Sequence, residues 1–176
     1  MKLLIAYASR NGVTRRCAQM LADSLPDTVE TELVDIKATE VSIEQYDALV
    51  LGGSVIAGRI DKRIKKIMRS LKKSKSQLPC ALFICCGLSQ RFEEYADTQP
   101  PIGYFPSLGV HHFGGELKPD KVKGFDKLVV RHMRKSINEL DFEDGDTSDI
   151  SLPEIIPENI LLLSEELKKL AKSIKS

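Results

Sequence analysis

Hydroxyl, amide and small residues gather directly after the first apolar run of the sequence. Residues 3–7 are apolar, and Ser9, Asn11, Gly12 and Thr14 follow them as a helical pattern begins. Backbone N–H groups at a helix start attract anions, and hydroxyl and amide side chains add hydrogen-bond donors. Asn11 and Gly12 tolerate the turn that lets a backbone curl around an anion. The stretch therefore predicts an anion-binding site.

Two common phosphate motifs are missing from this stretch. No Lys follows Gly12, so the P-loop pattern for nucleoside triphosphates fails, and the dinucleotide fingerprint G-x-G-x-x-G is also absent. A phosphate monoester held by neutral groups fits the donors best. The alternative is that these residues form only a helix cap and a turn, with no ligand.

Strand and helix patterns alternate along the chain around this site. Helical spacing marks residues 14–25 and 61–71. Several strands are apolar at almost every position, which is typical of a parallel sheet covered on both faces. The alternation predicts a three-layer α/β/α sandwich of the flavodoxin-like type, with a five-stranded parallel sheet of order 2-1-3-4-5. The expected strands are residues 3–7, 29–36, 48–52, 81–86 and 110–117.

The chain length of 176 residues fits one domain, 1–176. The crossover of residues 87–109 contains three prolines, so we expect it to be largely loop, with a helix only over residues 89–97. A long loop at the carboxyl end of a central strand is typical of a lid or binding loop. Two C-terminal helices are expected at about 121–140 and 157–175, joined by an acidic, turn-rich loop.

The composition narrows the classes of function. The chain has 26 Lys and Arg residues against 25 Asp and Glu residues, and its formal net charge of +1 gives no support to nucleic-acid binding. No segment approaches membrane-spanning length, and the opening apolar run is too short for a secretory signal. The four cysteines show neither a metal-ligand spacing nor a disulfide framework. We expect a cytoplasmic protein with no metal site and no catalytic triad, whose oligomeric state stays open.

Three stretches at the carboxyl edge of the expected sheet resemble the flavodoxin family. "SRNGVT" resembles its phosphate loop, [ST]-x-[TN]-G-x-T, and "YDALVLGGSVIAGR" resembles its third strand and the loop after it. "ALFICCGLSQ" resembles its fourth strand and second isoalloxazine loop. The likeness covers nearly the whole chain. Through "FGGEL" and "GDTSD" it is nearest to the flavodoxin-domain group that includes menaquinone-dependent protoporphyrinogen oxidase.

This resemblance implies an FMN-binding protein that acts in electron transfer or as a small flavin oxidoreductase. Its partner would be a redox protein or a small acceptor such as a quinone, with a link to protoporphyrinogen as a further option. The first loop would hold the phosphate, the second would border the flavin edge that carries N5, and the third would border the pyrimidine side. The implied FMN-binding residues are Ser9, Arg10, Asn11, Gly12, Val13, Thr14, Ser54, Val55, Ile56, Ala57, Gly58, Cys86, Gly87, Leu88 and Ser89.

Two details follow from the same resemblance. The peptide at Gly58 is expected to change its orientation when N5 gains a proton. An aromatic side chain that covers the flavin ring would have to come from the long crossover, where it could equally well pack the proline-rich loop. The candidates are Phe92, Tyr95, Tyr104 and Phe105.

Two other functions remain open from the sequence. Residues 59–75 carry nine basic residues and one acid, which predicts a positively charged helix face. That face would suit an FMN-free interaction module that docks an acidic partner or an anionic membrane surface, or it is simply solvated. Cys85 and Arg91 have the bare spacing of a cysteine-dependent phosphatase, which would require a thiol with a lowered pKa at Cys85.

Overall fold

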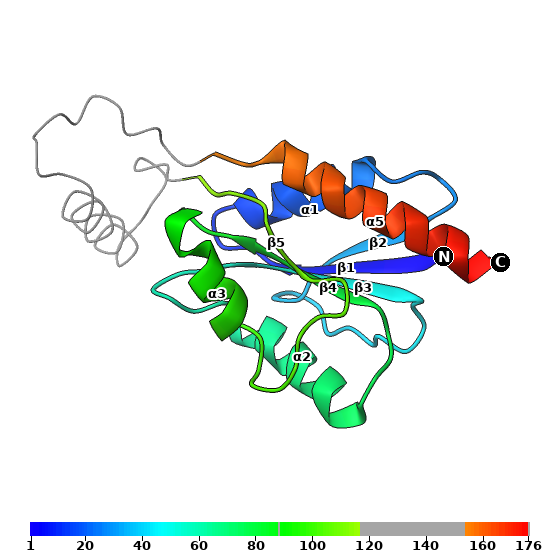
Figure 1. Cartoon of the computed structure of the whole chain (residues 1–176), viewed down its shortest axis with the longest axis horizontal. Coiled ribbons are helices and arrows are strands. Elements are labelled where there is room, and N and C mark those ends of the chain that lie inside the picture. Colours follow the sequence, from blue (N-terminus) through cyan, green and yellow to red (C-terminus); the bar gives the residue numbers. More distant parts are fainter. Residues whose placement is uncertain (88, 117–153, 176) are drawn as a thin grey trace, which may run out of the picture.

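The computed structural model describes residues 1–87, 89–116 and 154–175 (Figure 1). Its centre is a sheet of five parallel strands in the order β2-β1-β3-β4-β5, which confirms the predicted topology. Within the described residues, no helix combines the length and apolar character needed to cross a membrane. The strands are β1 (Lys2–Ala8), β2 (Glu30–Asp35), β3 (Ala48–Ser54), β4 (Cys80–Cys85) and β5 (Val110–His112).

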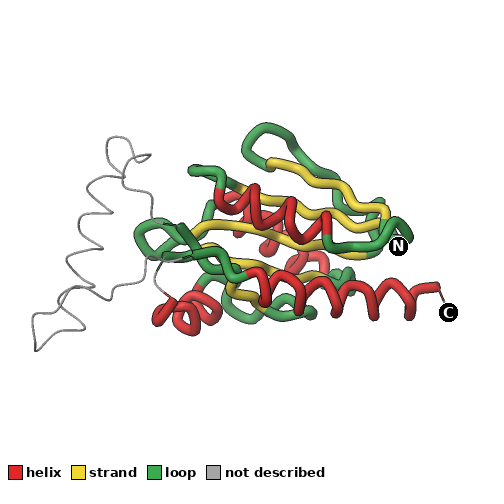
Figure 2. The backbone as a smooth tube through the Cα atoms, turned by 90° about the horizontal axis from the view of Figure 1, so that it is seen from above, coloured by secondary structure: helices red, strands yellow, loops and turns green. Residues whose placement is uncertain are grey.

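Helices cover both faces of this sheet, so the fold has three layers. Helices α1 (Val13–Asp23) and α5 (Pro157–Lys175) lie over one face, and Figure 2 looks down on them above the strands. Helices α2 (Lys62–Ser74) and α3 (Phe92–Thr98) lie on the opposite face (Figure 1). A short 3₁₀ turn, η1 (Ser89–Arg91), precedes α3, so the helix expected over residues 89–97 is divided into two pieces.

The two-residue period of the strands divides the core into two clusters. In β1, Leu3 and Ile5 pack towards α1 and α5, whereas Leu4 and Ala6 pack towards α2. All four side chains are fully buried. Strands buried on both faces must be apolar throughout, which is why the central strands read as continuous apolar runs.

The last strand is shorter than the sequence predicts. We expected a strand over residues 110–117, but β5 ends at His112 and residue 117 lies outside the described residues. Gly114 has a φ of 75° and forms an isolated antiparallel bridge with Ile155, just before α5. Backbone hydrogen bonds with β4 continue to Gly114, and there the segment before α5 becomes a second pairing partner of the chain. The helix expected at 121–140 and the acidic loop after it lie outside the described residues.

Candidate functional site

The loop between β1 and α1 leaves the start of the helix open. Gly12 is the N-cap residue of α1 with a φ of 86°, and no side chain caps the helix. The Ser9 hydroxyl accepts a hydrogen bond from the Gly12 N–H at 3.1 Å, which stabilises the turn before the helix. The first N–H groups of α1 thus have no side-chain acceptor, which does not favour the cap-only alternative.

Thr14 lies deeper than the rest of this loop. Its side chain is buried, with only 1% of its surface exposed. Asn11 and Arg10, by contrast, are exposed. The first loop therefore presents Asn11 and Arg10 outward, whereas Thr14 is buried against the rest of the structure.

A hollow of about 380 Å³ lies where the strand order reverses, at the carboxyl ends of β1 and β3. Pairing of Ala8 with Gly53 in adjacent strands brings the first and second predicted loops together there. Its volume is within the range of small-molecule sites. The hollow is lined by Ala8, Ser9, Arg10, Lys37, Ser54, Ile56, Arg59, Ile60 and Asp61.

This hollow is more positively charged than the neutral phosphate site that we expected from the sequence. Arg10, Lys37 and Arg59 all line it, and the Lys37 ammonium donates to the Ser9 carbonyl at 3.0 Å. The one acid in the lining, Asp61, caps α2 and pairs with Arg63 at 3.3 Å. The predicted phosphate site with neutral donors is thus accompanied by three cations.

The second predicted loop is a tight two-residue turn after β3. Ile56 and Arg59 form an antiparallel bridge with N–H···O distances of 3.0 and 3.1 Å. Ala57 and Gly58 between them have φ values of 49° and 73°, the signs of a type I′ turn. Left-handed backbone is unfavourable for Ala, so the surrounding structure must hold this turn in place.

Gln99, at the end of α3, supplies that support. Its amide oxygen accepts from the Ile60 N–H at 2.9 Å, and its amide nitrogen donates to the Gly58 carbonyl at 3.2 Å. Gln99 is 2% exposed, and its bond with Ile60 is buried, whereas its bond with the exposed Gly58 is partly buried. The Gly58 carbonyl, whose peptide was expected to reorient, is therefore engaged by the long crossover.

The third predicted loop shares the carboxyl edge but does not line the hollow. The Cys86 N–H donates to the Gly114 carbonyl at 2.8 Å, and the Cys86 sulfur lies 3.3 Å from Nε2 of His112. Burial lowers the pKa of His112. Ser89 lines a separate hollow of about 460 Å³ together with His112, Gly87 is half-buried, and Leu88 lies outside the described residues.

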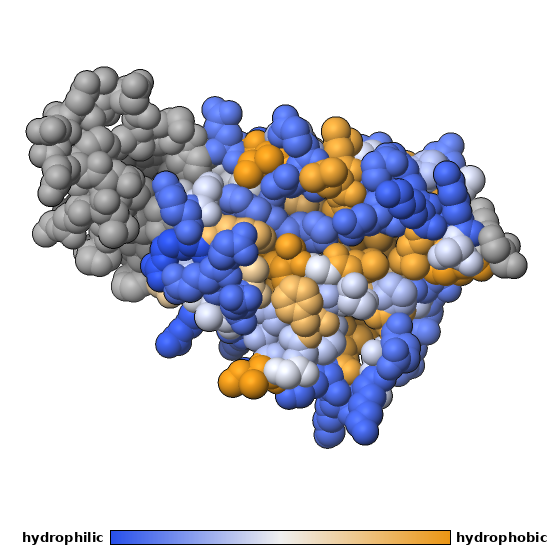
Figure 3. All heavy atoms as spheres, viewed as in Figure 1, coloured by the Kyte–Doolittle hydropathy of each residue, from blue (hydrophilic) through white to orange (hydrophobic). Residues whose placement is uncertain are grey.

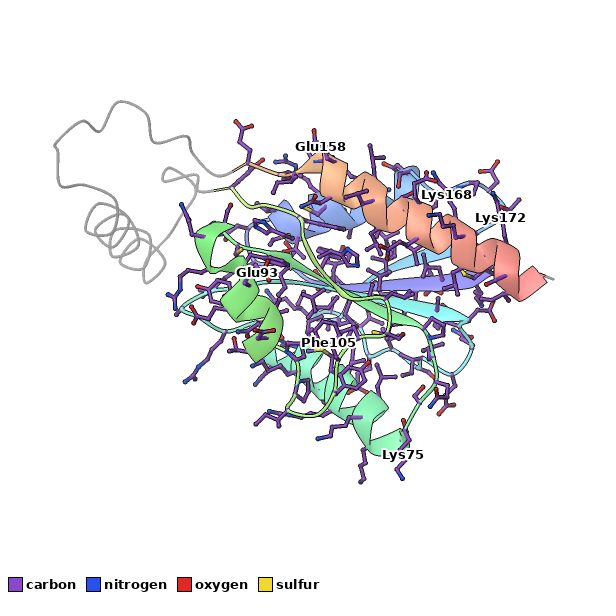
Figure 4. The ribbon with its side chains drawn as sticks, in the orientation of Figure 1. Lys75, Glu93, Phe105, Glu158, Lys168 and Lys172 are labelled. Carbon is purple, nitrogen blue, oxygen red and sulfur yellow. The ribbon has the colours of Figure 1, made fainter. Side chains whose placement is uncertain are left out.

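None of the four candidate aromatic residues lines the 380 Å³ hollow. Phe92 stacks on His112 with ring centroids 4.8 Å apart, and Tyr95 is buried in the core. Tyr104 packs against the core cluster on the α2 side of the sheet, whereas Phe105 is 60% exposed on the crossover (Figure 4). Packing is the role visible for three of them, and Phe105 alone points freely outward.

The geometry opposes the phosphatase alternative. The neighbouring Cys17 thiol, 3.7 Å away, and burial raise the pKa of Cys85 well above its ordinary value, whereas a nucleophilic thiol needs the reverse. Arg91 is exposed, and its guanidinium pairs with the Glu94 carboxylate at 2.8 Å. Cys85 and Arg91 do not form an anion clamp.

The structure brings together some of the predicted FMN-binding residues. Ser9, Arg10, Ser54 and Ile56 line one hollow, whereas the other described members do not line it and Ser89 belongs to a separate hollow. Sequence reasoning missed Lys37, which follows β2, although parallel topology brings every strand end to this edge. Arg59 stands one residue beyond the predicted second loop. Nothing in the sequence marks Gln99.

The chain matches the family model of the flavodoxin domain over residues 4–143, so it belongs to the flavodoxin domain family. No curated protein matches the sequence significantly.

Three solved structures illustrate what the fold is similar to. An oxidised flavodoxin from Bacillus cereus is 18% identical, over 80% of this chain and 99% of that one, with a TM-score of 0.47. An archaeal flavodoxin is 16% identical, over 79% and 97%, with a TM-score of 0.45. A Lactobacillus acidophilus flavoprotein in complex with FMN is 20% identical, over 63% and 92%, with a TM-score of 0.42.

Proposed function

We propose that this chain binds FMN non-covalently at the 380 Å³ hollow and acts in electron transfer. The observation that carries the proposal is the uncapped start of α1, turned by left-handed Gly12, beside a hollow edged with cations. A helix start and cations are the environment that a phosphate dianion requires. Membership of the flavodoxin domain family supports FMN as the source of that phosphate.

Each of the three loops would hold a different part of the cofactor. Ser9, Asn11 and the first N–H groups of α1 would hold the phosphate, and Arg10 and Lys37 would balance its charge. The turn of residues 56–59 would offer backbone groups to the ring, while residues 86–89 would border it from β4. FMN itself supplies the electron chemistry once it is bound.

A small redox substrate is the second candidate for the same site. The loops resemble the flavodoxin-domain group that includes menaquinone-dependent protoporphyrinogen oxidase, so a quinone and protoporphyrinogen are the compounds to test. The cations Arg10, Lys37 and Arg59 favour a substrate that carries carboxylates. Anaerobic mixing of the flavin-loaded protein with protoporphyrinogen, and of the reduced protein with menadione, would reveal such turnover in the flavin absorbance.

The test of FMN binding is a pair of fluorescence titrations, one with FMN and one with riboflavin. Riboflavin lacks the phosphate, so it should bind about a hundredfold more weakly, which corresponds to about 3 kcal/mol. Asn11→Ala should weaken the binding of FMN and leave the affinity for riboflavin unchanged. Thr39 is exposed and lies outside the 380 Å³ hollow, so Thr39→Ala should alter neither affinity. Equal affinities for the two flavins would contradict a phosphate site.

A further inference from the structure

A second and larger hollow runs beside this site, between α2 and the segment that follows β2. It has a volume of about 760 Å³ and is named here the α2 groove. Its floor is apolar and its sides are basic, with one acid, Glu40. The apolar residues are Ile36, Val41, Ile43 and Ile67, and the basic ones are Lys37, Lys62, Arg63, Lys66 and Arg69.

The positive charge of the α2 groove is poorly balanced. Lys62, Lys66 and Arg69 are exposed and form no ion pair within the part of the chain that the structure describes, and Arg63 is paired only with Asp61. Burial lowers the pKa of Lys65 on the same helix, and the charges of Arg69 and Arg59 lower it further. Concentrated charge of one sign beside apolar surface attracts ligands of the opposite sign.

The α2 groove also adjoins the candidate FMN site. Lys37 lines both hollows, and its ammonium bonds the Ser9 carbonyl in the first loop. The remaining basic residues continue along α2 away from that point. Figure 3 shows hydrophilic side chains gathered where α2 lies, at the bottom of the view. An occupant of the groove would therefore lie next to the cofactor.

We propose that the α2 groove docks an acidic segment of a redox partner protein, with carboxylates on the basic sides and an apolar side chain on the floor. The identity of the partner as a redox protein rests on the proposed FMN function. The 13 residues of α2 span about 20 Å, which exceeds a small anion and suits a peptide segment.

The same features weigh against a membrane as the occupant. A helix that lies on a membrane needs large apolar side chains beside its basic ones. None of the exposed large apolar residues of the described structure lines the groove, since Ile102 lies by Lys72 near the other end of α2, and α2 turns Ile64, Met68 and Leu71 into the core. The apolar surface of the groove is recessed between two segments, so a flat surface cannot reach it.

The first test measures binding of a fluorescein-labelled peptide of alternating glutamates and leucines by fluorescence anisotropy, without FMN and then with FMN. The wild-type chain should bind the peptide, and added salt should weaken binding. Lys62→Glu/Lys66→Glu should bind at least about tenfold more weakly at low salt. The matched control is Lys73→Glu/Lys75→Glu, which changes the charge by the same amount in the last turn of α2 and at its C-cap residue Lys75 (labelled in Figure 4), both outside the groove.

The second test follows reduction of the FMN-loaded protein by a reduced acidic [2Fe–2S] ferredoxin in a stopped-flow instrument. One electron leaves the iron–sulfur cluster and enters the flavin, and no bond is broken. The groove variant should lower the second-order rate constant about tenfold at low salt, while the control variant stays near wild type. FMN titration of each variant shows whether the cofactor site is intact.

Loss of peptide binding and of rate in the groove variant alone supports the proposal. Equal losses in both variants would overturn it in favour of a diffuse charge effect. Absence of peptide binding would overturn it as well, as would binding to phosphatidylglycerol vesicles in place of the peptide. Peptide binding that persists while FMN fails to bind would refute the proposed cofactor and leave the groove as an acidic-peptide site.

Discussion

Gly12 forms the turn between β1 and α1 through its backbone conformation alone. Its φ is 86°, and a Cβ added there would meet nothing within 4 Å. A side chain thus has space at this position but would force an L-residue into left-handed backbone. The turn is what leaves the start of α1 open to an anion.

Gly12→Ala should destabilise the fold by about 1 kcal/mol and weaken FMN binding, since the turn opens to relieve its strain. Urea unfolding and FMN titration would measure the two effects. Gly12→Asn is the control. Because Asn tolerates left-handed backbone, this variant should lose less stability and less FMN affinity than Gly12→Ala. Equal losses for Ala and Asn would mean that the backbone conformation is not the reason for glycine.

The Cys80 thiol makes stability depend on alkaline pH. Burial raises its pKa from the ordinary 9.0 to about 12. The raised value means that its stabilising contribution is complete below pH 9 and is lost as the pH rises towards 12. Between pH 8 and pH 10 the loss should be about 1.4 kcal/mol. Urea unfolding at both pH values should show this component in the wild type, and Cys80→Ala should lack it; identical pH dependence would refute the assignment.

Individual residues were predictable only where the motif is local. Ser9, Asn11 and Gly12 stand together in the sequence, so their shared loop follows from spacing. The burial of Thr14 depends on how α1 packs on the sheet, and no sequence pattern reports whether a given hydroxyl faces the core or solvent. Lys37 was missed for a similar reason, because it follows β2 and reaches the first loop only in the folded sheet.

At the scale of elements, Gln99 joins the end of α3 to the turn after β3. Two hydrogen bonds depend on its amide, a buried one with Ile60 and a partly buried one with Gly58. Through them the long crossover fixes the shape of a loop that belongs to the proposed cofactor site.

Gln99→Leu should cost about 2–3 kcal/mol, because the Ile60 N–H is left buried without an acceptor. Hydrogen exchange at the Ile60 amide should become faster, and urea unfolding should report the loss of stability. Gln77→Leu is the control, since Gln77 is exposed and should change stability by less than about 0.5 kcal/mol. Unchanged exchange at Ile60 in the Gln99 variant would rule out the clamp.

The sheet was predictable because its signal repeats at every strand. Continuous apolar runs indicated strands buried on both faces, and alternation with helices fixed their parallel order. The end of β5 was not predictable, because Gly114 pairs with Ile155 across a long separation in sequence. Propensity alone continues that strand through residues whose partner lies elsewhere.

At the scale of the whole molecule, charge is segregated although the net charge is only +1. Basic residues concentrate on α2 and around the first loop, so one edge of the molecule is positive. The proposed cofactor site and the α2 groove share that edge through Lys37. Average composition hides this arrangement, because it counts charges without their positions.

The central claim is that FMN binds at the carboxyl edge of β1 and β3, and backbone NMR of the labelled chain titrated with FMN tests it most directly. We predict saturation at one FMN per chain, with the largest amide shifts in residues 9–14 and 56–59 and smaller ones near residues 86–87. Amides of α5 beyond its first turn should remain unchanged. Absence of shifts in excess FMN, or shifts confined to α2 and the segment after β2, would contradict the account.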